Sequence, residues 1–338
     1  MIKIGNEEIG VFPLLLAPME DVSDPPFRAL CKEFGADLMY TEFISTDGLV
    51  RNAEKSVQKL DIYDYERPIG IQIFGSDFEA MKYSAIIVEK HKPTLLDINY
   101  GCPVKKVVSR EAGAGILKNI PKMIALTKAV IESTTLPVTV KTRLGWDSET
   151  INIEEVAERL QDIGVQALSI HARTRTQMYK GHSDWSWISK VKNNPRIHIP
   201  IFGNGDIDSA EKAYEYKNTY DVDGIMIGRA AIGYPWIFRE IKHYFATGEL
   251  MAPPTVEERV YAARTHLKHS ITWKGNNLGI LEMRRHYASY FKGLPDIKEF
   301  RARLTNSMIF EELDEILNEI QTKYVGFDFQ KPLEMKQI

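Results

Sequence analysis

Short apolar runs alternate with longer amphipathic stretches over the first 240 residues of the chain, and each run ends in polar or glycine-containing sequence. Short apolar runs bounded by turn residues are typical of buried strands. They predict eight strands, at residues 14–17, 38–41, 69–74, 95–98, 138–141, 167–170, 199–202 and 224–227. Helices are predicted between them, including residues 27–34, 78–90, 120–133, 153–163 and 209–216.

Eight alternating β and α units favour a closed (β/α)8 TIM barrel, with a doubly wound open sheet as the alternative. Asp24 followed by Pro25 indicates where the first helix begins. An aspartate side chain can accept hydrogen bonds from the free amides of a first turn, and proline is tolerated there.

The pattern changes after Gly248. Residues 251–254 contain two prolines and are typical of a linker, and only helical signals follow, from Thr255 to about residue 325. Thr255 and Glu258 have the spacing of a capping box. We therefore expect a barrel domain over residues 1–250 and an all-helical domain over residues 251–330.

The length of 338 residues suits one barrel with a smaller appendix. No apolar stretch approaches the roughly 20 residues that a membrane span needs, and the N-terminus lacks the features of a signal peptide. Cys31 and Cys102 are the only cysteines, which is too few for a disulfide framework or a Cys-x-x-Cys metal site. We expect a cytoplasmic protein with no disulfide, no metal and no membrane contact.

The net charge of −3 hides an uneven distribution. Residues 259–303 contain ten lysines and arginines against three acidic residues. Histidines and other aromatic residues are interleaved with them: His266, His269, Trp273, His286, Tyr287 and Tyr290. This composition suits phosphate contacts and stacking on exposed nucleic-acid bases. The alternative is a solvated helical face with aromatic residues in the core.

Unusual polar and glycine residues gather at or just after the ends of the predicted strands. They are Ala17-Pro18-Met19, Gln72, Asn99 with Cys102, Lys141-Thr142-Arg143, the segment His171 to Arg175, Asn204-Gly205-Asp206, and Gly228-Arg229. The C-terminal ends of barrel strands meet at one face, so these residues are expected together. Each alone also has a structural interpretation, as a snorkelling lysine, a core histidine or a turn glycine.

Cys102 lies between a glycine and a proline after the fourth strand, so it is either a positioned catalytic group or a core thiol. The glycines and Arg229 after the last two strands suit a phosphate group, and Lys141 suits a ring that becomes negative. A reduced flavin has both properties, whereas a sugar phosphate has only the first.

In this order and spacing, over about residues 12–310, these motifs resemble those of the tRNA-dihydrouridine synthases. The motif Asn99-Tyr100-Gly101-Cys102-Pro103, the following Lys105-Lys106-Val107 and the segment 228–236 favour the bacterial B-type branch. Departures are small: Tyr100 and Ala172 lie where the family varies, and Ser183 replaces a common alanine.

The resemblance implies that FMN binds in the barrel mouth and is reduced by NADPH or NADH. Hydride then passes to C6 of a uracil in the tRNA D-loop, while Cys102 donates a proton to C5. The implied cofactor-binding residues are Ala17, Pro18, Met19, Gln72, Lys141, His171, Asn204, Gly205, Asp206, Gly228 and Arg229. The implied substrate-binding residues are Asn99, Lys105, Arg110, Arg173, Arg175, Arg284 and Arg285. We expect a monomer with tRNA as its partner.

A thiol donates a proton at C5 if its pKa stays near or above about 8.5, which an apolar surrounding favours. The target uridine must leave its stack to reach such a pocket. Two other functions fit part of the pattern: an FMN barrel that acts on a free pyrimidine, as dihydroorotate dehydrogenases do, and a tRNA-binding module without turnover. A barrel that binds only a phosphate group, such as an aldolase, is a more distant alternative.

Overall fold

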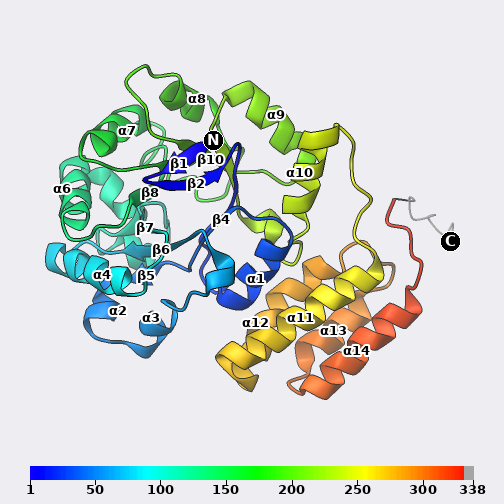
Figure 1. The fold of residues 1–338 in the computed structure, drawn as a ribbon. Coiled ribbons are helices and arrows are strands. Elements are labelled where there is room, and N and C mark those ends of the chain that lie inside the picture. Colours follow the sequence, from blue (N-terminus) through cyan, green and yellow to red (C-terminus); the bar gives the residue numbers. More distant parts are fainter. Residues whose placement is uncertain (331–338) are drawn as a thin grey trace.

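Eight parallel strands form a closed ring in the computed structural model, which describes residues 1–330 (Figure 1). They are β3 (Leu14–Leu16), β4 (Leu38–Tyr40), β6 (Ile69–Phe74), β7 (Leu95–Asn99), β8 (Val138–Arg143), β9 (Leu168–His171), β10 (Ile201–Asn204) and β11 (Gly224–Ile227). The ring closes because β11 pairs with β3 and β4 pairs with β6. All eight predicted strands are confirmed, and closure excludes the doubly wound sheet.

Helices surround this ring, and the five predicted in the barrel are confirmed. The helices are α1 (Pro25–Glu33), α2 (Thr46–Val50), α3 (Glu54–Gln58), α4 (Phe78–Lys90), α5 (Lys105–Val108), α6 (Ile120–Ile131), α7 (Ile153–Asp162), α8 (Ser186–Lys192), α9 (Ala210–Tyr220) and α10 (Ile237–Thr247). Short 3-10 turns lie at Asp64–Glu66, Gly113–Lys118 and Arg229–Ala231, and β5 (Ile44–Ser45) adds to β6. Asp24 caps α1 as predicted, because its Oδ1 accepts from the backbone N–H of Phe27 at 2.9 Å.

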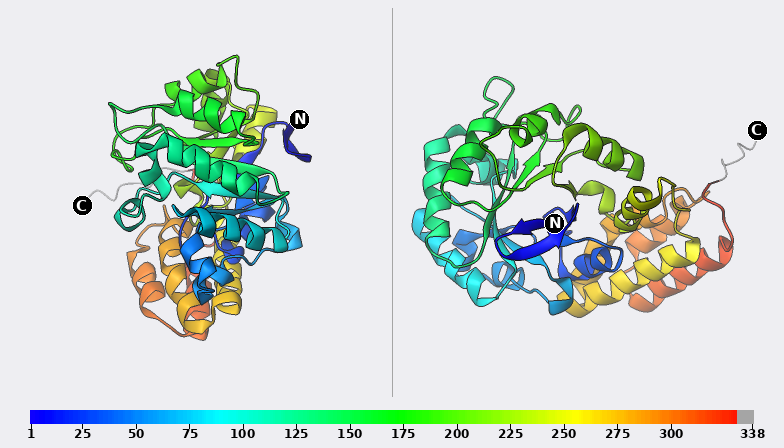
Figure 2. Two further views of the ribbon diagram at one scale, coloured as in Figure 1. Left: turned by 90° about the vertical axis from the view of Figure 1, so that its left-hand side faces the viewer. Right: turned by 45° about the horizontal axis from the view of Figure 1, so that its top comes forward.

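An antiparallel hairpin that the sequence pattern did not predict covers one end of the barrel (Figure 2). It consists of β1 (Ile2–Ile4) and β2 (Glu7–Gly10). Ile4 and Ile9 are buried in one apolar cluster with residues inside the ring, among them Leu38 and Leu95 at the starts of their strands. The hairpin therefore closes the N-terminal end of the barrel and leaves the C-terminal strand ends free to form a site.

Residues 251–330 contain helices and no strand (Figure 1). The helices are α11 (Val256–Lys274), α12 (Asn276–Tyr290), α13 (Lys298–Asn306) and α14 (Phe310–Lys323). The predicted capping box is confirmed: Glu258 N–H donates to Thr255 Oγ1 at 3.2 Å, and Thr255 N–H donates to Glu258 Oε2 at 2.8 Å. Over residues 1–330, no helix has the length and apolar character that crossing a membrane requires.

The helical bundle shares its apolar core with the barrel. Leu30 and Phe34 at α1, and Trp236 before α10, belong to the same buried cluster as the core residues of α11 to α14. The ammonium of Lys274 also donates to Asp24 Oδ2 at 2.5 Å and to Glu282. The linker at residues 251–254 lies outside any helix or strand, as predicted. The apolar core of the bundle nevertheless contains residues from both sides of this linker. A domain boundary at residue 250 therefore stays a prediction.

Two histidines are buried where α11 and α12 pack on α1. The ring centroids of His266 and His286 lie 4.4 Å apart, and both rings contact Phe27. Burial lowers the pKa of His266 to about 4, with Asp24 opposing this shift and the charge of Lys274 adding to it. Burial, followed by the charges of His266, Arg285 and Lys274, lowers the pKa of His286 well below its usual value. Both imidazoles are therefore neutral at pH 7.

We expect this pair to make the folded state sensitive to acid. Histidines in the unfolded chain titrate near pH ~6.5, so below that pH the unfolded state binds more protons and the free energy of unfolding falls. One histidine contributes up to about 1.4 kcal/mol per pH unit. His286→Leu should remove the contribution of about one proton to this pH dependence, because leucine does not titrate. The substitution breaks no hydrogen bond at Nδ1, since that atom has no partner among the described residues. Urea unfolding at pH 7, 6 and 5 measures the effect.

The matched control is His269→Gln, since His269 is exposed on the same helix as His266. This variant should keep the wild-type dependence of unfolding free energy on pH. Equal slopes for wild type and His286→Leu would contradict the prediction.

Candidate active site

The C-terminal ends of the barrel strands surround a cavity of about 740 Å³, here called the mouth cavity. Twelve of the residues to which the sequence analysis assigned a role line it: Ala17, Pro18, Met19, Asn99, Cys102, Lys141, His171, Asn204, Gly205, Asp206, Gly228 and Arg229. The lining also includes Phe43, Arg143 and Tyr179, to which the sequence analysis gave no role. The fold thus brings together side chains from seven strand ends.

A second cavity of about 790 Å³, here called the side cavity, lies between barrel loops and the bundle. Its lining includes Lys106 and Arg110 from the segment around α5 and Trp273 near the end of α11. Four residues line both cavities, namely Glu20, Phe43, Cys102 and Val104. The thiol-bearing residue therefore lies on the wall that the two cavities share.

The loop that carries Cys102 is held by hydrogen bonds to its backbone. Asn99, the last residue of β7, accepts through Oδ1 from the N–H groups of Gly101 at 2.9 Å and Cys102 at 2.8 Å. The carbonyl of Cys102 accepts from the N–H of Ala114 at 3.0 Å. At Gly113 a Cβ atom would lie 2.9 Å from this carbonyl, so the neighbouring glycine permits the close approach.

Two arginines support the same loop. Arg143 is 2% exposed, and its Nε donates to the carbonyl of Gly101 at 2.7 Å, while Nη1 donates to two carbonyls of the segment after β9. Arg175 Nη2 donates to the carbonyl of Pro103 at 3.2 Å. Arg175, predicted to bind substrate, thus contacts the cysteine loop in the structure. Arg143, which the sequence analysis placed at a strand end without a role, holds the same loop.

Burial raises the pKa of the Cys102 thiol, whose residue is 6% exposed, and the negative charge of Glu20 adds to this shift. The backbone N–H of Val104 and the charges of Arg143 and Lys141 act in the opposite direction but do not outweigh burial. The thiol is therefore protonated at neutral pH, which suits an acid better than a nucleophile.

The ammonium of Lys141 lies in the mouth cavity with no direct partner among residues 1–330. Burial, followed by the nearby charge of Arg143, lowers the pKa of Lys141 to about 8, with Asp97 and Cys102 acting against the shift. In the described part of the chain, no hydrogen bond or ion pair is formed by its ammonium, although Lys141 lines the mouth cavity. An anionic group in this cavity would gain a charge-assisted contact from it.

His171 is neutral for a similar reason. Burial lowers its pKa well below the usual value, and the positive charges of Arg143, Lys141, Arg173 and Arg229 act in the same direction. His171 thus offers the mouth cavity a hydrogen-bonding ring that carries no charge.

Two arginines and one carboxylate lie together after β9, β10 and β11, and of these Asp206 and Arg229 line the mouth cavity. Arg173 Nη2 donates to Asp206 Oδ2 at 2.6 Å, and Arg229 Nη2 lies 3.3 Å from Asp206 Oδ1. Burial opposes ionisation of Asp206, but hydrogen bonds from Arg173 and Ser183 hold its pKa below the usual value. The three residues together carry a net positive charge next to Gly205, whose φ of 130° favours glycine. This composition suits a phosphate.

Arg173 itself is 2% exposed and bonded to Asp206 and to the carbonyl of Gly181. The prediction that Arg173 contacts tRNA is therefore not supported, because its buried guanidinium is bonded to Asp206 and to a loop carbonyl. Gln72 is also fully buried and does not line the cavity; its side chain bonds to Asp97 and Asn99. Direct contact between Gln72 and a ligand stays a prediction.

The other basic residues singled out from the sequence lie on the surface to different degrees. Lys105 and Arg110 are exposed beside the side cavity, and Arg110 lies 3.8 Å from Asp47. Arg285 is exposed and donates to the carbonyl of Asp21 at 2.5 Å. Arg284 is half-buried with its Nη2 against the sulfur of Met308. Of the two neighbouring arginines, Arg285 is thus the exposed one.

Four aromatic residues of the basic stretch cannot stack on exposed bases. His266, His286, Tyr287 and Tyr290 are all less than 4% exposed. The prediction was wrong for them because a small bundle fills its core with the aromatic residues of α11 and α12. His269 remains exposed, and Trp273 lines the side cavity. The basic residues that remain exposed in this stretch are Lys268, Arg285, Lys292 and Lys298.

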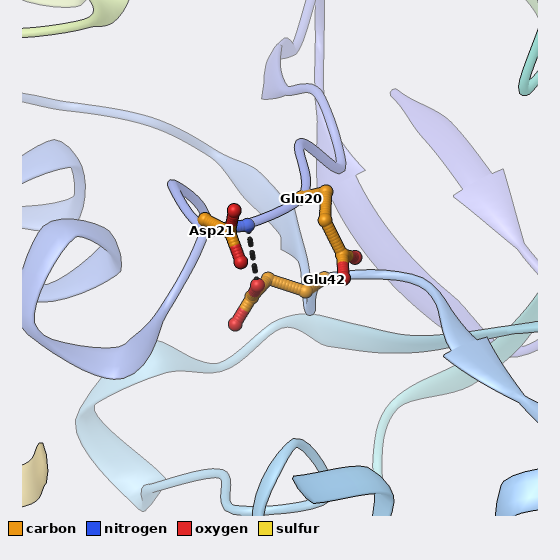
Figure 3. A group of neighbouring side chains, drawn as sticks. All are labelled: Glu20, Asp21 and Glu42. Atoms are coloured by element: carbon orange, nitrogen blue, oxygen red, sulfur yellow. Dashed lines mark hydrogen bonds between the residues drawn. The ribbon is translucent and has the colours of Figure 1, made fainter. Parts of the chain in front are cut away.

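Three carboxylates that no sequence motif connects lie close together (Figure 3). All three line the side cavity, and Glu20 also lines the mouth cavity. Glu20 and Asp21 follow β3, Glu42 follows β4, and Asp21 N–H donates to Glu42 Oε1 at 2.6 Å. The ammonium of Lys59 lies 2.6 Å from Glu20 Oε1 and 3.4 Å from Glu42 Oε1. Arg285 pairs with Asp21 at 3.6 Å. Cations of the chain therefore offset much of this negative charge.

Comparison with known proteins agrees with the motifs. The model of the dihydrouridine synthase (Dus) family matches residues 15–324. The chain is 40% identical over 291 residues to tRNA-dihydrouridine synthase B of Pseudomonas putida, covering 86% of each protein. It is 36% identical over 302 residues to a probable tRNA-dihydrouridine synthase of Rickettsia conorii, covering 89% of this chain and 90% of the relative.

Among solved structures, a complex of 2-naphthoyl-CoA reductase with 2-naphthoyl-CoA is similar, with a TM-score of 0.57 at 11% identity over 72% of this chain and 51% of that one. Histamine dehydrogenase from Rhizobium sp. 4-9 has a TM-score of 0.53 at 11% identity, over 78% of this chain and 50% of that one. The chain matches about half the length of these two proteins, and at such low identity the likeness shows the barrel fold alone.

The family match includes both the barrel and the helical bundle, and the strand-end motifs lie within it. The resemblance stated from the sequence is thereby confirmed, including relatives that carry the name of the B type. The chain belongs to the dihydrouridine synthase family.

Proposed function

We propose that this protein reduces the C5=C6 bond of uridines in the tRNA D-loop, with FMN in the mouth cavity and Cys102 as the proton donor. The observation that carries the proposal is the position of the Cys102 thiol. It is protonated at neutral pH and lies on the wall shared by a cavity at the strand ends and a cavity that faces the bundle.

The mouth cavity fits FMN in size and in the chemistry of its lining. Its volume of about 740 Å³ lies in the range of roughly 300–1,000 Å³ that small-molecule sites occupy. Lys141 provides a cation for a ring that becomes negative, and its ammonium has no hydrogen bond or ion pair among the described residues. Arg229, which pairs with Asp206, provides a cation for a phosphate. Gly205 and Gly228 let a ligand approach the backbone closely. When bound and reduced, the flavin supplies the hydride.

The chain's own contribution to the reaction is a proton and an electrostatic environment. Addition of hydride at C6 of uracil places negative charge on C5 and on the C4 carbonyl, so an acid must deliver a proton to C5. Burial keeps that proton on Cys102 until it is needed. The ammonium of Lys141 stabilises negative charge in the mouth, and neutral His171 hydrogen-bonds without adding to the charge.

The side cavity is the proposed entry for the flipped uridine, because it reaches Cys102 from the bundle side. Exposed Lys105, Lys106 and Arg110 flank it, and Arg285 on α12 extends the basic surface. These cations would bind tRNA phosphates. The proposal also includes NADPH or NADH as the reductant of FMN, a monomeric state and a cytoplasmic location.

Replacement of the thiol tests the central assignment. Cys102→Ala should lower the rate of dihydrouridine formation by about 10²–10⁴-fold, the usual contribution of a general acid. Reduction of the bound flavin by NADPH should continue, because that step needs no proton from Cys102. Mass spectrometry of tRNA and flavin absorbance measure the two steps.

Cys31→Ala is the matched control, since Cys31 is buried in α1 and lines neither cavity. It should form dihydrouridine at the wild-type rate. A wild-type rate in Cys102→Ala would exclude the acid role, and no product from the unmodified protein would exclude the function.

The pKa of Lys141 predicts how flavin binding depends on pH. As pH rises through about 8, Lys141 loses its charge in the ligand-free protein, so the affinity for FMN should fall by up to tenfold per pH unit. Lys141→Met should bind FMN weakly and without this fall. Quenching of FMN fluorescence between pH 7 and 9 measures the affinity. Arg229→Met is the comparison: its binding should be weaker but keep the fall, and parallel curves for wild type and Lys141→Met would refute the assignment.

Salt dependence separates a tRNA enzyme from one that acts on a free pyrimidine. A protein that neutralises six to ten phosphates loses about 10³–10⁵ in affinity between 50 and 200 mM salt. We expect tRNA binding to weaken steeply, and Lys106→Gln and Arg285→Gln each to reduce the slope by about one. Lys128→Gln, at an exposed position of α6, should leave it unchanged. If binding and turnover did not change with salt concentration, a free pyrimidine would be favoured as the substrate over tRNA.

A further inference from the structure

A continuous chain of hydrogen bonds leads from the barrel interior to the cysteine loop. Asp97 Oδ2 accepts from Gln72 Nε2 at 2.5 Å, and Gln72 Oε1 accepts from Asn99 Nδ2 at 2.8 Å. Asn99 Oδ1 in turn accepts from the N–H of Cys102 at 2.8 Å. The three side chains come from the neighbouring strands β6 and β7 and are at most 5% exposed.

The direction of this chain is fixed at both ends. A backbone N–H can only donate, so Asn99 must turn its oxygen toward Gly101 and Cys102 and its nitrogen toward Gln72. An ionised carboxylate can only accept, so Gln72 must turn its nitrogen toward Asp97 and its oxygen toward Asn99. The two requirements agree, and one orientation of both amides satisfies every group.

Asp97 is an unusual residue for the inside of a barrel strand. A buried carboxylate destabilises a fold unless it is well bonded, and the donors to Asp97 are Gln72 on one oxygen and Thr139 on the other. Burial raises the pKa of Asp97 to about 6, with both hydrogen bonds and the charge of Lys141 acting against the shift. The carboxylate is therefore ionised at neutral pH and acts only as an acceptor.

We propose that Asp97 is a positioning residue for the thiol of Cys102 and acts through Gln72 and Asn99. The inference deepens the proposed function, since it takes Cys102 as the group that must meet C5 of the uracil. Asp97 itself touches no reacting atom. By fixing both amides it fixes the backbone from which the thiol projects, and a displacement of about 1 Å at a reacting group can cost 10²-fold in rate.

The test measures turnover and the order of the loop separately. Asp97→Ala, in a Cys31→Ala background, should lower kcat for dihydrouridine formation at least tenfold and leave KM for tRNA within twofold. Hydrogen exchange of the peptide containing residues 99–104 should become faster, since the N–H groups of Gly101 and Cys102 lose a fixed acceptor. Asp97→Asn should restore most of kcat and of the protection, because its carbonyl oxygen can accept from Gln72.

Thr139→Val is the matched control. It removes the hydrogen bond to the other oxygen of the same carboxylate, so it should lower thermal stability but leave kcat and the exchange of residues 99–104 unchanged. Equal losses in Thr139→Val and Asp97→Ala would show a general structural role and overturn the proposal. Wild-type kcat and exchange in Asp97→Ala would overturn it as well.

If Asp97→Ala does not fold, Gln72→Met interrupts the same chain one bond closer to Asn99 and should expose the same two N–H groups; unchanged exchange there would refute the proposal. The exchange measurement needs no turnover. It therefore decides the role of Asp97 even if the unmodified protein forms no dihydrouridine, a result that would refute the proposed function alone.

Discussion

Closure of the parallel ring is the constraint on which every other feature of this structure depends. Because β3 pairs with both β4 and β11, and β4 pairs with β6, the strands cannot spread into an open sheet. Their C-terminal ends then surround one cavity, which brings Ala17 and Arg229 together although they lie at opposite ends of the barrel sequence. The β1–β2 hairpin fills the other end with apolar side chains. The polar side chains of the barrel therefore gather around the mouth cavity, where a ligand can form hydrogen bonds and ion pairs with them.

The mouth cavity contains positively charged side chains next to a thiol that keeps its proton. The mouth cavity is lined by the cations Lys141, Arg143 and Arg229 and by the carboxylates Glu20, Asp206 and Asp208. Burial lowers the pKa of Lys141, and burial together with the nearby cations keeps His171 neutral. The same cations ought to ionise the nearby thiol, yet burial and Glu20 keep the pKa of Cys102 raised. A protonated thiol with cations nearby is the arrangement that suits proton donation to a developing carbanion.

The sequence predicted the elements that local signals determine: the eight strands, the caps at Asp24 and Thr255, and the gathering of polar residues at strand ends. It did not predict the β1–β2 hairpin, whose strands are too short and too charged to show a clear pattern. A single sequence also shows which residues are charged or aromatic but not which way they face. Arg173 and the His266–His286 pair were therefore assigned to a surface although they are buried. Asp97 lies within an apolar run, so its pattern did not mark it as a site residue. Glu20 lies close to Glu42 only because the neighbouring strands β3 and β4 end at the same face.

Lys274 gives the boundary between barrel and bundle a further meaning. Its ammonium joins Asp24, the residue that caps α1, to Glu282 of α12, while Leu30 and Trp236 share the core of the bundle. The segment between β3 and this cap includes Met19 and Glu20, which line the mouth cavity. Exchange of the bundle alone, by recombination at the linker, would therefore break these contacts with the barrel. A bundle from another protein would have to supply both a lysine that pairs with Asp24 and an apolar surface that packs on α1.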